Sequence, residues 1–357
     1  MSQGASSTPE TVPADCTQGT VPMTIAEIES ACDASMPLDF STHSLEAPEL
    51  SLRCMFYPLG FPTLLRTNSP EILSQFQDLW SIFEKQFDTK PIRVDVQVVE
   101  GGSAPCPPAP VVSIAQPLVI GIADPENYSI MDLDRNTTLI TLSRATLRHV
   151  SYLRYFMLES SPLCHIATRY ATPVHGGCVA FNGRGMLLCG DSGAGKSSLS
   201  YACARAGWTY ITDDASYVLN EGKDRLVTGN CHRIRFRPSA AELFPEVEGL
   251  EITPRATGKP SIEMPTACFP QMACAPTAQV DFVVFLNRRR RGSPKLVTYR
   301  GDVARYYMRQ ALYGSAESLT AQYAATDRML TAEVFELQYS DLDWAVERLE
   351  TLALEGR

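Results

Sequence analysis

Residues 190–197 have the composition and spacing of a phosphate-binding loop. The segment reads Gly-Asp-Ser-Gly-Ala-Gly-Lys-Ser and matches G-x-x-x-x-G-K-[ST] at every fixed position. Glycines in such a loop let successive backbone N–H groups surround phosphate oxygens without a Cβ in the way. The helix that should follow directs its positive end at the same anion. The expected nucleotide-binding residues are Gly190, Asp191, Ser192, Gly193, Ala194, Gly195, Lys196, Ser197 and Ser198.

Two side chains at the end of this loop supply further contacts. Lys196 is expected to reach the β and γ phosphates of ATP, and the Ser197 hydroxyl is expected to ligate Mg²⁺. The alternative is a glycine-rich turn that carries Lys-Ser by chance. The flanking sequence favours the phosphate loop, because it predicts a strand over 185–189 and a helix over 196–205.

A pair of carboxylates, Asp213 and Asp214, follows the loop after one helix and one strand. The apolar strand over 208–212 ends at this pair, and we expect it to lie beside the strand that leads into the loop. One carboxylate could act as a general base while the other binds the metal ion. An ordinary acidic turn that opens a hairpin is the alternative.

His175 comes just before the strand pair that leads into the loop. Its position predicts a place at one edge of the site, where an imidazole could assist the reaction. A lone histidine is more often a structural or surface residue, and that reading stays open.

The strand and helix signals of the second half of the chain surround these residues. The predicted elements are a hairpin of 178–181 and 185–189, the helix 196–205, a hairpin of 216–219 and 225–228, a strand at 281–286 and a last helix at 341–354. Asn182-Gly183 is a strong turn signal for the first hairpin. Ser340 and Asp343 are a plausible capping pair for the last helix.

The first half of the chain has alternating helix and strand patterns without a recognisable motif. The predicted elements are a helix from Asn68 or Ser69 to Phe87, a strand at 92–98, a loop at 101–110, strands at 118–122, 128–133 and 138–142, and a helix at 144–159. We expect a disordered tail over 1–20, an α+β region over 21–150 and a P-loop domain over 151–357.

Composition excludes several classes of protein. The 357 residues are 45% hydrophobic and 20% charged, with a formal net charge of −9, which argues against general nucleic-acid or anionic-membrane binding. The first 20 residues lack the features of a signal peptide, and no stretch is apolar enough to span a membrane. The 11 cysteines form no C-x-x-C pair. Reduced thiols in a cytoplasmic protein are therefore expected.

Residues 175–218, HGGCVAFNGRGMLLCGDSGAGKSSLSYACARAGWTYITDDASYV, resemble the catalytic domain of bacterial HPr kinase/phosphorylase and its kinase relatives. The shared features are a His-Gly before a hairpin, a loop close to G-D-S-G-x-G-K-S, and a strand that ends in Asp-Asp. The resemblance departs at Ser198, where the family usually has an acidic residue, and it fades beyond Leu219. It implies a divergent member with an α/β nucleotide-binding fold, a mixed sheet and a likeness to phosphoenolpyruvate carboxykinase.

The resemblance also implies a role for each matching residue. Asp213 would take the proton from the acceptor hydroxyl, and Asp214 would support it and the Mg²⁺. His175 would help to position phosphate or base, with Lys196 on the β/γ phosphates and Ser197 on the metal. Rings of identical subunits in the family make a homo-oligomer an expectation by analogy.

Basic side chains outside the motif could serve the phosphoryl acceptor. Arg233, Arg235 and Arg237 alternate along a predicted strand and would share one face, which suits phosphate or carboxylate binding. Arg288–Arg291 and Lys259 are further candidates. A solvated strand face or polar turn explains these groups equally well.

The sequence therefore predicts an ATP-dependent kinase that transfers the γ-phosphoryl group to a hydroxyl, with serine in a protein or peptide as the expected acceptor. A kinase of a small metabolite or a free amino acid is the first alternative. A nucleotide-binding regulatory module without catalysis is the second.

Overall fold

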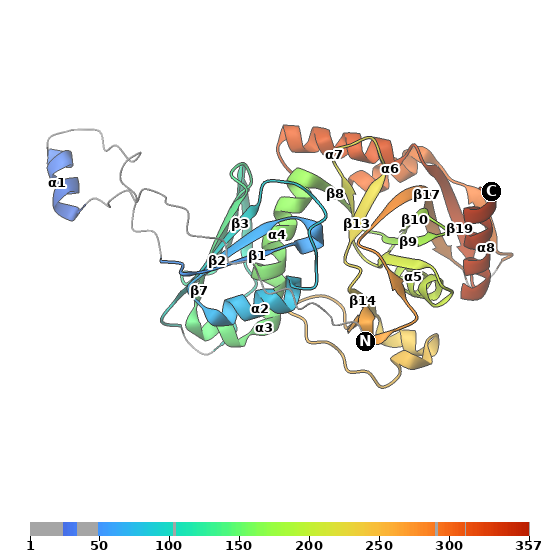
Figure 1. The fold of residues 1–357 in the computed structure, drawn as a ribbon, viewed down its shortest axis with the longest axis horizontal. Helices are drawn as coiled ribbons and strands as arrows, with labels where there is room; N and C mark the ends of the chain where they lie inside the picture. The colour runs from blue at the N-terminus through green and yellow to red at the C-terminus, as the bar shows by residue number, and fades with distance from the viewer. Residues whose placement is uncertain (1–23, 34–48, 103–104, 290–291, 311, 357) are drawn as a thin grey trace, which may run out of the picture.

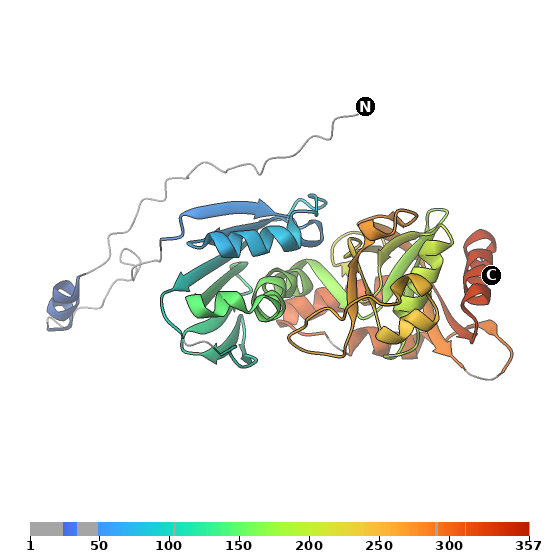
Figure 2. The same cartoon turned by 90° about the horizontal axis from the view of Figure 1, so that it is seen from below.

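The computed structural model describes residues 24–33, 49–102, 105–289, 292–310 and 312–356. The tail expected at 1–20 lies outside the described residues. An isolated helix α1 (Ile25–Asp33) precedes two sheet-containing units, which lie side by side along the long axis of the molecule (Figures 1 and 2). We refer to residues 49–170 as the first unit and to residues 171–356 as the second unit.

The first unit is built on a seven-stranded sheet in the order β1-β2-β3-β7-β6-β5-β4. Its elements are β1 (Leu52–Phe56), β2 (Thr63–Thr67), α2 (Pro70–Trp80), β3 (Ile92–Val99), β4 (Val111–Ala115), β5 (Leu118–Asp124), β6 (Asn127–Asp132) and β7 (Thr137–Ser143). The strands β2, β3 and β7 are parallel, and the other pairs are antiparallel. The four strands predicted between residues 92 and 142 are confirmed, whereas β1, β2 and β4 were not predicted.

Helix α2 begins where the sequence predicted it. The Ser69 hydroxyl accepts a hydrogen bond from the Ile72 N–H (3.3 Å), and Pro70 occupies the first turn. The helix ends at Trp80 rather than Phe87. The apolar spacing continues past the helix because Phe87, in a segment without regular secondary structure, still packs on the core of the first unit.

The helix predicted at 144–159 extends further and has several parts. A 3₁₀ turn (Arg144–Arg148), α3 (Val150–Leu153), a π-helical turn (Arg154–Glu159), α4 (Ser160–His165) and a second π-helical turn (Ile166–Tyr170) follow one another. The helix continues through Ser160, whose hydroxyl donates to the Phe156 carbonyl oxygen (2.5 Å) within the helix. Leu153, Met157 and Ile166 pack in the core of the first unit, so the expected division at 150/151 falls within a segment that belongs to this unit.

The second unit has a mixed ten-stranded sheet, as expected. Eight strands follow the order β16-β11-β9-β10-β17-β13-β12-β8, and β19 pairs with β17 and with β18. They are β8 (Ala171–Val174), β9 (Gly177–Phe181), β10 (Arg184–Cys189), β11 (Thr209–Thr212), β12 (Ser216–Leu219), β13 (Leu226–Gly229), β16 (Ala273–Cys274), β17 (Thr277–Arg288), β18 (Lys295–Thr298) and β19 (Glu333–Tyr339). Both predicted hairpins are confirmed. The expectation that β11 lies beside β10 is wrong, because β9 turns back at Asn182-Gly183 and inserts between them.

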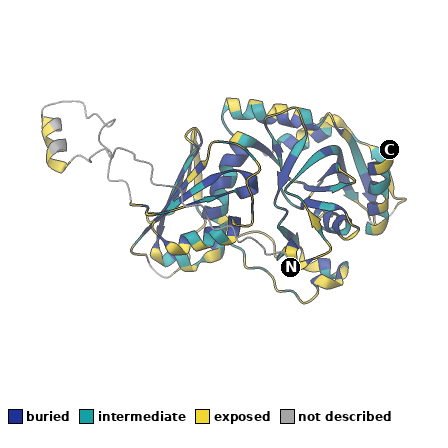
Figure 3. Ribbon diagram, in the orientation of Figure 1, coloured by how far each residue is buried: buried dark blue, intermediate teal, exposed yellow. Residues whose placement is uncertain are grey.

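Helices cover both faces of this sheet (Figure 1). Helix α5 (Lys196–Arg205) has the predicted bounds and packs with α8 (Leu342–Glu355) on one face. Helices α6 (Gly301–Arg309) and α7 (Ala316–Met329) pack on the other. The predicted cap of α8 is wrong: the Asp341 carboxylate accepts from the Trp344 N–H (2.8 Å). The buried central strands in Figure 3 show that both units have their own core.

A two-stranded ribbon, β14 (Arg233–Phe236) and β15 (Ile262–Pro265), packs over α5. The ribbon brings residues 230–265 close to the loop of residues 190–197, which joins β10 to α5. Among the described residues, no helix is both long and apolar enough to cross a membrane. The described cysteines are free thiols, and those of β9, β10 and α5 are buried.

Candidate active site

The phosphate-loop motif lies between β10 and α5, as the sequence predicted. Gly190, Gly193 and Gly195 have φ values of 142°, 91° and 99°, a region that disfavours residues with a Cβ. A Cβ on Gly195 would clash with the Tyr339 hydroxyl oxygen. That hydroxyl donates to the Ala194 carbonyl oxygen (2.9 Å). Glycine at this position therefore lets β19 brace the loop directly.

A second tyrosine supports the start of the loop. The Tyr307 hydroxyl on α6 accepts a hydrogen bond from the Gly190 N–H (3.1 Å) and donates to the His175 carbonyl oxygen (2.7 Å). Sequence reasoning missed both tyrosines. They are more than 100 residues from the loop along the chain, and no local pattern marks them.

The Lys196 side chain is buried within the loop. Its ammonium donates to the carbonyl oxygens of Gly190 (2.7 Å) and Asp191 (3.2 Å). Burial lowers the pKa of Lys196, and the charge of Asp214 is the largest effect that opposes this shift. The ammonium lies within the ring of loop peptide groups, where it adds positive charge to a site with backbone donors.

Asp213 is only 5% exposed and is held from several directions. Its carboxylate accepts from the Tyr210 hydroxyl (2.9 Å) and from the Arg235 N–H (3.4 Å). Burial, followed by the negative charge of Asp214, raises the pKa of Asp213 to about 6, although hydrogen bonds from Ser197 and Tyr210 oppose this. Asp213 is thus a weakly acidic, fixed carboxyl beside the first turn of α5, as a general base requires.

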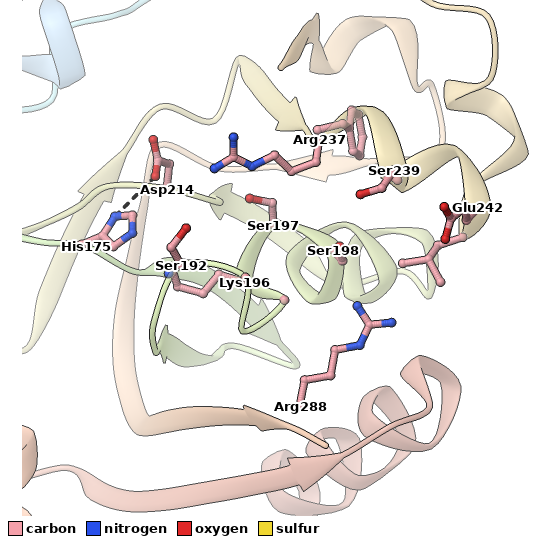
Figure 4. Close-up of a pocket in the computed structure, with 15 residues that line it drawn as sticks. His175, Ser192, Lys196, Ser197, Ser198, Asp214, Arg237, Ser239, Glu242 and Arg288 are labelled. Atoms are coloured by element: carbon pink, nitrogen blue, oxygen red, sulfur yellow. Dashed lines mark ion pairs between the residues drawn. The ribbon is translucent and has the colours of Figure 1, made fainter. Parts of the chain in front are cut away.

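Asp214 is different from its neighbour, with 42% of its side chain exposed. One carboxylate oxygen pairs with the Arg235 guanidinium (2.7 Å), and the other lies 3.4 Å from His175 Nδ1 (Figure 4). Burial is the main cause that lowers the pKa of His175, and the positive charge of Lys196 adds to it. In the structure, therefore, the imidazole of His175 contacts the carboxylate of Asp214 and not that of Asp213.

Most of the predicted residues line a single cavity of about 260 Å³ at the loop. They are His175, Ser192, Gly193, Gly195, Lys196, Ser197, Ser198 and Asp214. Gly190, Asp191, Ala194 and Asp213 are not part of its lining. Arg237 and Arg288 also line this cavity, on opposite sides of Ser197 and Ser198 (Figure 4). Neither guanidinium has an ion-pair partner among the described residues, so both can contact an anion.

A second cavity of about 190 Å³ lies where the two units meet. Among the residues that the structure describes, only Asp214 lines both cavities. The second unit contributes Asp213, Asp214, Arg233, Arg235 and Glu263. The first unit contributes Leu59, Trp80, Arg154, Glu159 and Leu163, none of which the sequence singled out. The carboxylate pair thus separates the phosphate loop from a charged cavity at the junction.

The predicted arginine row is divided between the two cavities. Arg233 and Arg235 lie on β14 and line the junction cavity, whereas Arg237 follows the strand and lines the loop cavity. Lys259 is exposed and lines neither. In the other basic group Arg288 lines the loop cavity, and residues 290–291 lie outside the described residues.

The donors at the loop fit a nucleotide with Mg²⁺. The described residues contain no group of three or more His, Cys, Asp or Glu side chains that could hold a metal ion by themselves. Mg²⁺ commonly uses one or two protein ligands together with substrate phosphates and water. The Ser197 hydroxyl and the half-exposed Asp214 carboxylate, which line the same cavity as the glycine loop, match that requirement.

Comparisons with known proteins give a distant likeness. No protein-family model matches the chain. A solved structure from Coxiella burnetii, described as an Hpr(Ser) kinase/phosphatase, matches 52% of this chain and 99% of its own, with 16% sequence identity and a TM-score of 0.30. The similarity is therefore partial, and the chemistry of the site depends on the geometry described above.

Proposed function

We propose that the protein is an ATP-dependent kinase that transfers the γ-phosphoryl group to a hydroxyl. The observation that carries this proposal is the position of Asp213. This buried carboxyl, hydrogen-bonded to the first turn of the phosphate-loop helix, lines a second cavity that can admit an acceptor. A base between a phosphate site and an acceptor site is the arrangement that phosphoryl transfer to a hydroxyl needs.

The loop would hold the nucleotide through its backbone N–H groups and the N-terminal end of α5. Lys196 would neutralise the β/γ phosphates, and Arg237 and Arg288 would contact the phosphates from either side. Mg²⁺, held by Ser197 and Asp214 with the phosphate oxygens, would supply charge neutralisation when bound. Positioning and charge stabilisation would account for most of the rate enhancement.

In the transfer step the acceptor oxygen forms a bond to the γ-phosphorus, and the bond from that phosphorus to the ADP oxygen breaks. The hydroxyl proton passes to Asp213. With a pKa of about 6, this carboxyl is mostly ionised at neutral pH and is a better base than a solvent-exposed aspartate. Arg235 and His175 keep Asp214 oriented beside it.

A nucleotide-sensing module without catalysis is the second candidate, and the site argues against it. Burial of a carboxyl with a raised pKa destabilises the folded protein at neutral pH, and binding of ATP alone gives no reason for that cost.

The test is transfer of label from γ-labelled ATP with Mg²⁺ to the macromolecular and small-molecule fractions of a host lysate. We expect label in one of these fractions with the wild-type protein, and none with Lys196→Ala or Asp213→Asn. If the wild-type protein binds ATP and labels neither fraction, and Asp213→Asn behaves identically, the sensing module becomes the better account.

A further inference from the structure

The junction cavity contains an arginine, Arg233, whose guanidinium makes a single long ion pair among the described residues. Arg233 lies on β14 with about one third of its side chain exposed, and its guanidinium lies 3.8 Å from Glu263. No hydrogen bond joins this guanidinium to any residue that the structure describes. A guanidinium offers five N–H donors in a planar fork, and carboxylates are its best-matched partners.

The other two arginines of the cavity, Arg154 and Arg235, form short ion pairs with carboxylates. Arg154 donates to Glu159 (2.6 Å) and to Glu263 (2.9 Å), and Arg235 donates to Asp214 (2.7 Å) and contacts Glu263 (3.0 Å). Arg154 and Arg235 thus hold Glu159 and Glu263 at shorter distances, and Arg233 has only the 3.8 Å approach to Glu263. Burial, followed by the positive charge of Arg154, lowers the pKa of Arg233, and the charges of Glu159, Glu263 and Asp78 oppose this shift only in part. An added anion at Arg233 would offset the remaining effect of Arg154.

Arg233 and the proposed base are connected through the backbone. The Tyr210 hydroxyl lies 2.9 Å from Asp213 Oδ1 and 2.9 Å from the Arg233 carbonyl oxygen, and the Arg235 N–H donates to Asp213. Because Arg233 and Asp213 both line this cavity, a molecule held by Arg233 would lie in the same small cavity as Asp213. The cavity has a volume of about 190 Å³. That space suits a small compound or the end of a chain.

We propose that the acceptor carries a carboxylate as well as the reacting hydroxyl, and that Arg233 binds this carboxylate while Asp213 faces the hydroxyl. The proposal rests on the kinase function above and names its substrate class. Two sources share this chemistry: a free hydroxy acid, including a hydroxy amino acid, and the C-terminal residue of a peptide that ends in serine.

The experiment compares each acceptor with a form whose carboxylate is masked. Purified protein, Mg²⁺ and γ-labelled ATP are incubated with glycolate, L-lactate, D-glycerate, L-serine or a peptide that ends in serine. Methyl esters of the acids and the C-terminal amide of the peptide are the masked forms. We expect label on at least one carboxylate form, at a kcat/KM at least tenfold above its masked form. Label on free acids alone, or on the peptide alone, identifies the source.

A variant pair tests the role of Arg233 itself. Arg233→Gln should raise the KM of the best acceptor by about ten- to a hundredfold, the worth of a hydrogen-bonded charge, with little change in kcat. Arg255→Gln is the matched control, because Arg255 also lies near Glu263 (3.7 Å) but does not line the cavity. It should leave that KM unchanged. Calorimetric titration of the same acceptor should show the same loss of affinity without catalysis.

The outcomes separate this proposal from the kinase function. If lysate components take up label in a Lys196-dependent manner while carboxylate and masked forms are equal or unlabelled, the kinase stands and the carboxylate proposal fails. It also fails if Arg233→Gln and Arg255→Gln behave alike. If no acceptor of any kind takes up label, both proposals fall.

Discussion

At the scale of single residues, the site depends on two ionisable side chains whose burial is unfavourable for their charged forms. Lys196 and Asp213 are 8% and 5% exposed. Burial lowers the pKa of Lys196 and raises the pKa of Asp213, so it favours the neutral form of each. Such shifts are common at sites that bind or transfer charged groups. Asp214, next in the chain, is about half-exposed and is paired with Arg235. Two adjacent carboxylates thus have separate environments, and separate roles follow from them.

Replacing Lys196 should weaken nucleotide binding specifically. We expect Lys196→Ala to lose about ten- to a hundredfold in ATP affinity, because a charge-assisted contact to phosphate is removed. Isothermal titration of ATP with Mg²⁺ measures this. Lys259→Ala is the control, since that side chain is exposed and lies outside both cavities. Equal affinities in the two variants would contradict the assignment of the loop.

The raised pKa of Asp213 should appear as a dependence of stability on pH. The native protein holds the Asp213 proton up to about pH 6, whereas the unfolded chain releases it near 3.8. Its contribution to stability is therefore present at low pH and is lost as the pH rises between these values. Relative to the wild type, Asp213→Asn should gain about 2–3 kcal/mol between pH 4 and pH 7. Urea unfolding at both pH values tests this, and a constant difference would contradict it.

At the scale of elements, the loop is shaped as much by its surroundings as by its own sequence. Gly195 has a positive φ, and Tyr339 on β19 leaves no room for a side chain there. The start of α5 and the end of β19 are therefore fixed against each other. The helix N-terminus can point at phosphate only because this contact holds the loop in place.

A pair of glycine variants separates this contact from backbone strain. Gly195→Ala and Gly207→Ala both place alanine at positive φ, which costs about 1–2 kcal/mol. A Cβ on Gly207 meets nothing within 4 Å, whereas one on Gly195 meets Tyr339. We expect Gly195→Ala to lose more stability and most ATP binding, and Gly207→Ala to bind ATP normally. Thermal unfolding and ATP titration give both readouts. The account fails here if Gly207→Ala loses as much binding.

The sequence predicted best what is decided locally. The strand–loop–helix around Lys196 and the bounds of α5 follow from glycine positions, a turn signal and helix composition within about 30 residues. The helix predicted at 144–159 continues to Tyr170 in the structure, through α4 and two π-helical turns that no local sequence pattern marks. The prediction that β11 lies beside β10 was wrong because the order of strands in a sheet depends on pairing partners, which local patterns do not specify.

Contacts between residues far apart in the chain could not be predicted either, because local patterns do not specify them. Tyr307, Tyr339 and Arg154 have no unusual local context, and each joins the site through the path of the chain. The alternation of Arg233 and Arg235 was visible, but their division from Arg237 depended on where β14 ends.

At the scale of the whole molecule, the two units share contacts around the junction cavity. The Thr228 hydroxyl donates to the Leu59 carbonyl oxygen (3.2 Å), and the Gln322 amide donates to the Ala167 carbonyl oxygen (3.0 Å). The pair between Arg154 and Glu263 (2.9 Å) also crosses the junction. The proposed acceptor site therefore depends on both units, although the nucleotide site lies in the second alone.

Coupling between the units should appear in unfolding. Trp80 reports on the first unit, since Trp208 and Trp344 lie in the second. We expect Trp80 fluorescence in Trp208→Phe/Trp344→Phe to change in the same transition as the far-UV circular dichroism of that variant. ATP at 100 times its Kd should stabilise both signals by about 2.7 kcal/mol. Two separate transitions, with ATP acting on only one, would show that the junction does not couple the units.

The central claim, that Asp213 accepts a proton beside a bound nucleotide, is tested most directly by the single-turnover rate of phosphoryl transfer between pH 4.5 and 8. With the best acceptor from the lysate fractions, the wild-type rate should rise about tenfold per pH unit below about 6 and level off above it. Asp213→Asn should bind ATP with unchanged affinity and transfer about 10²–10⁴ times more slowly, without that rise. A variant with the wild-type rate and pH profile would contradict the account.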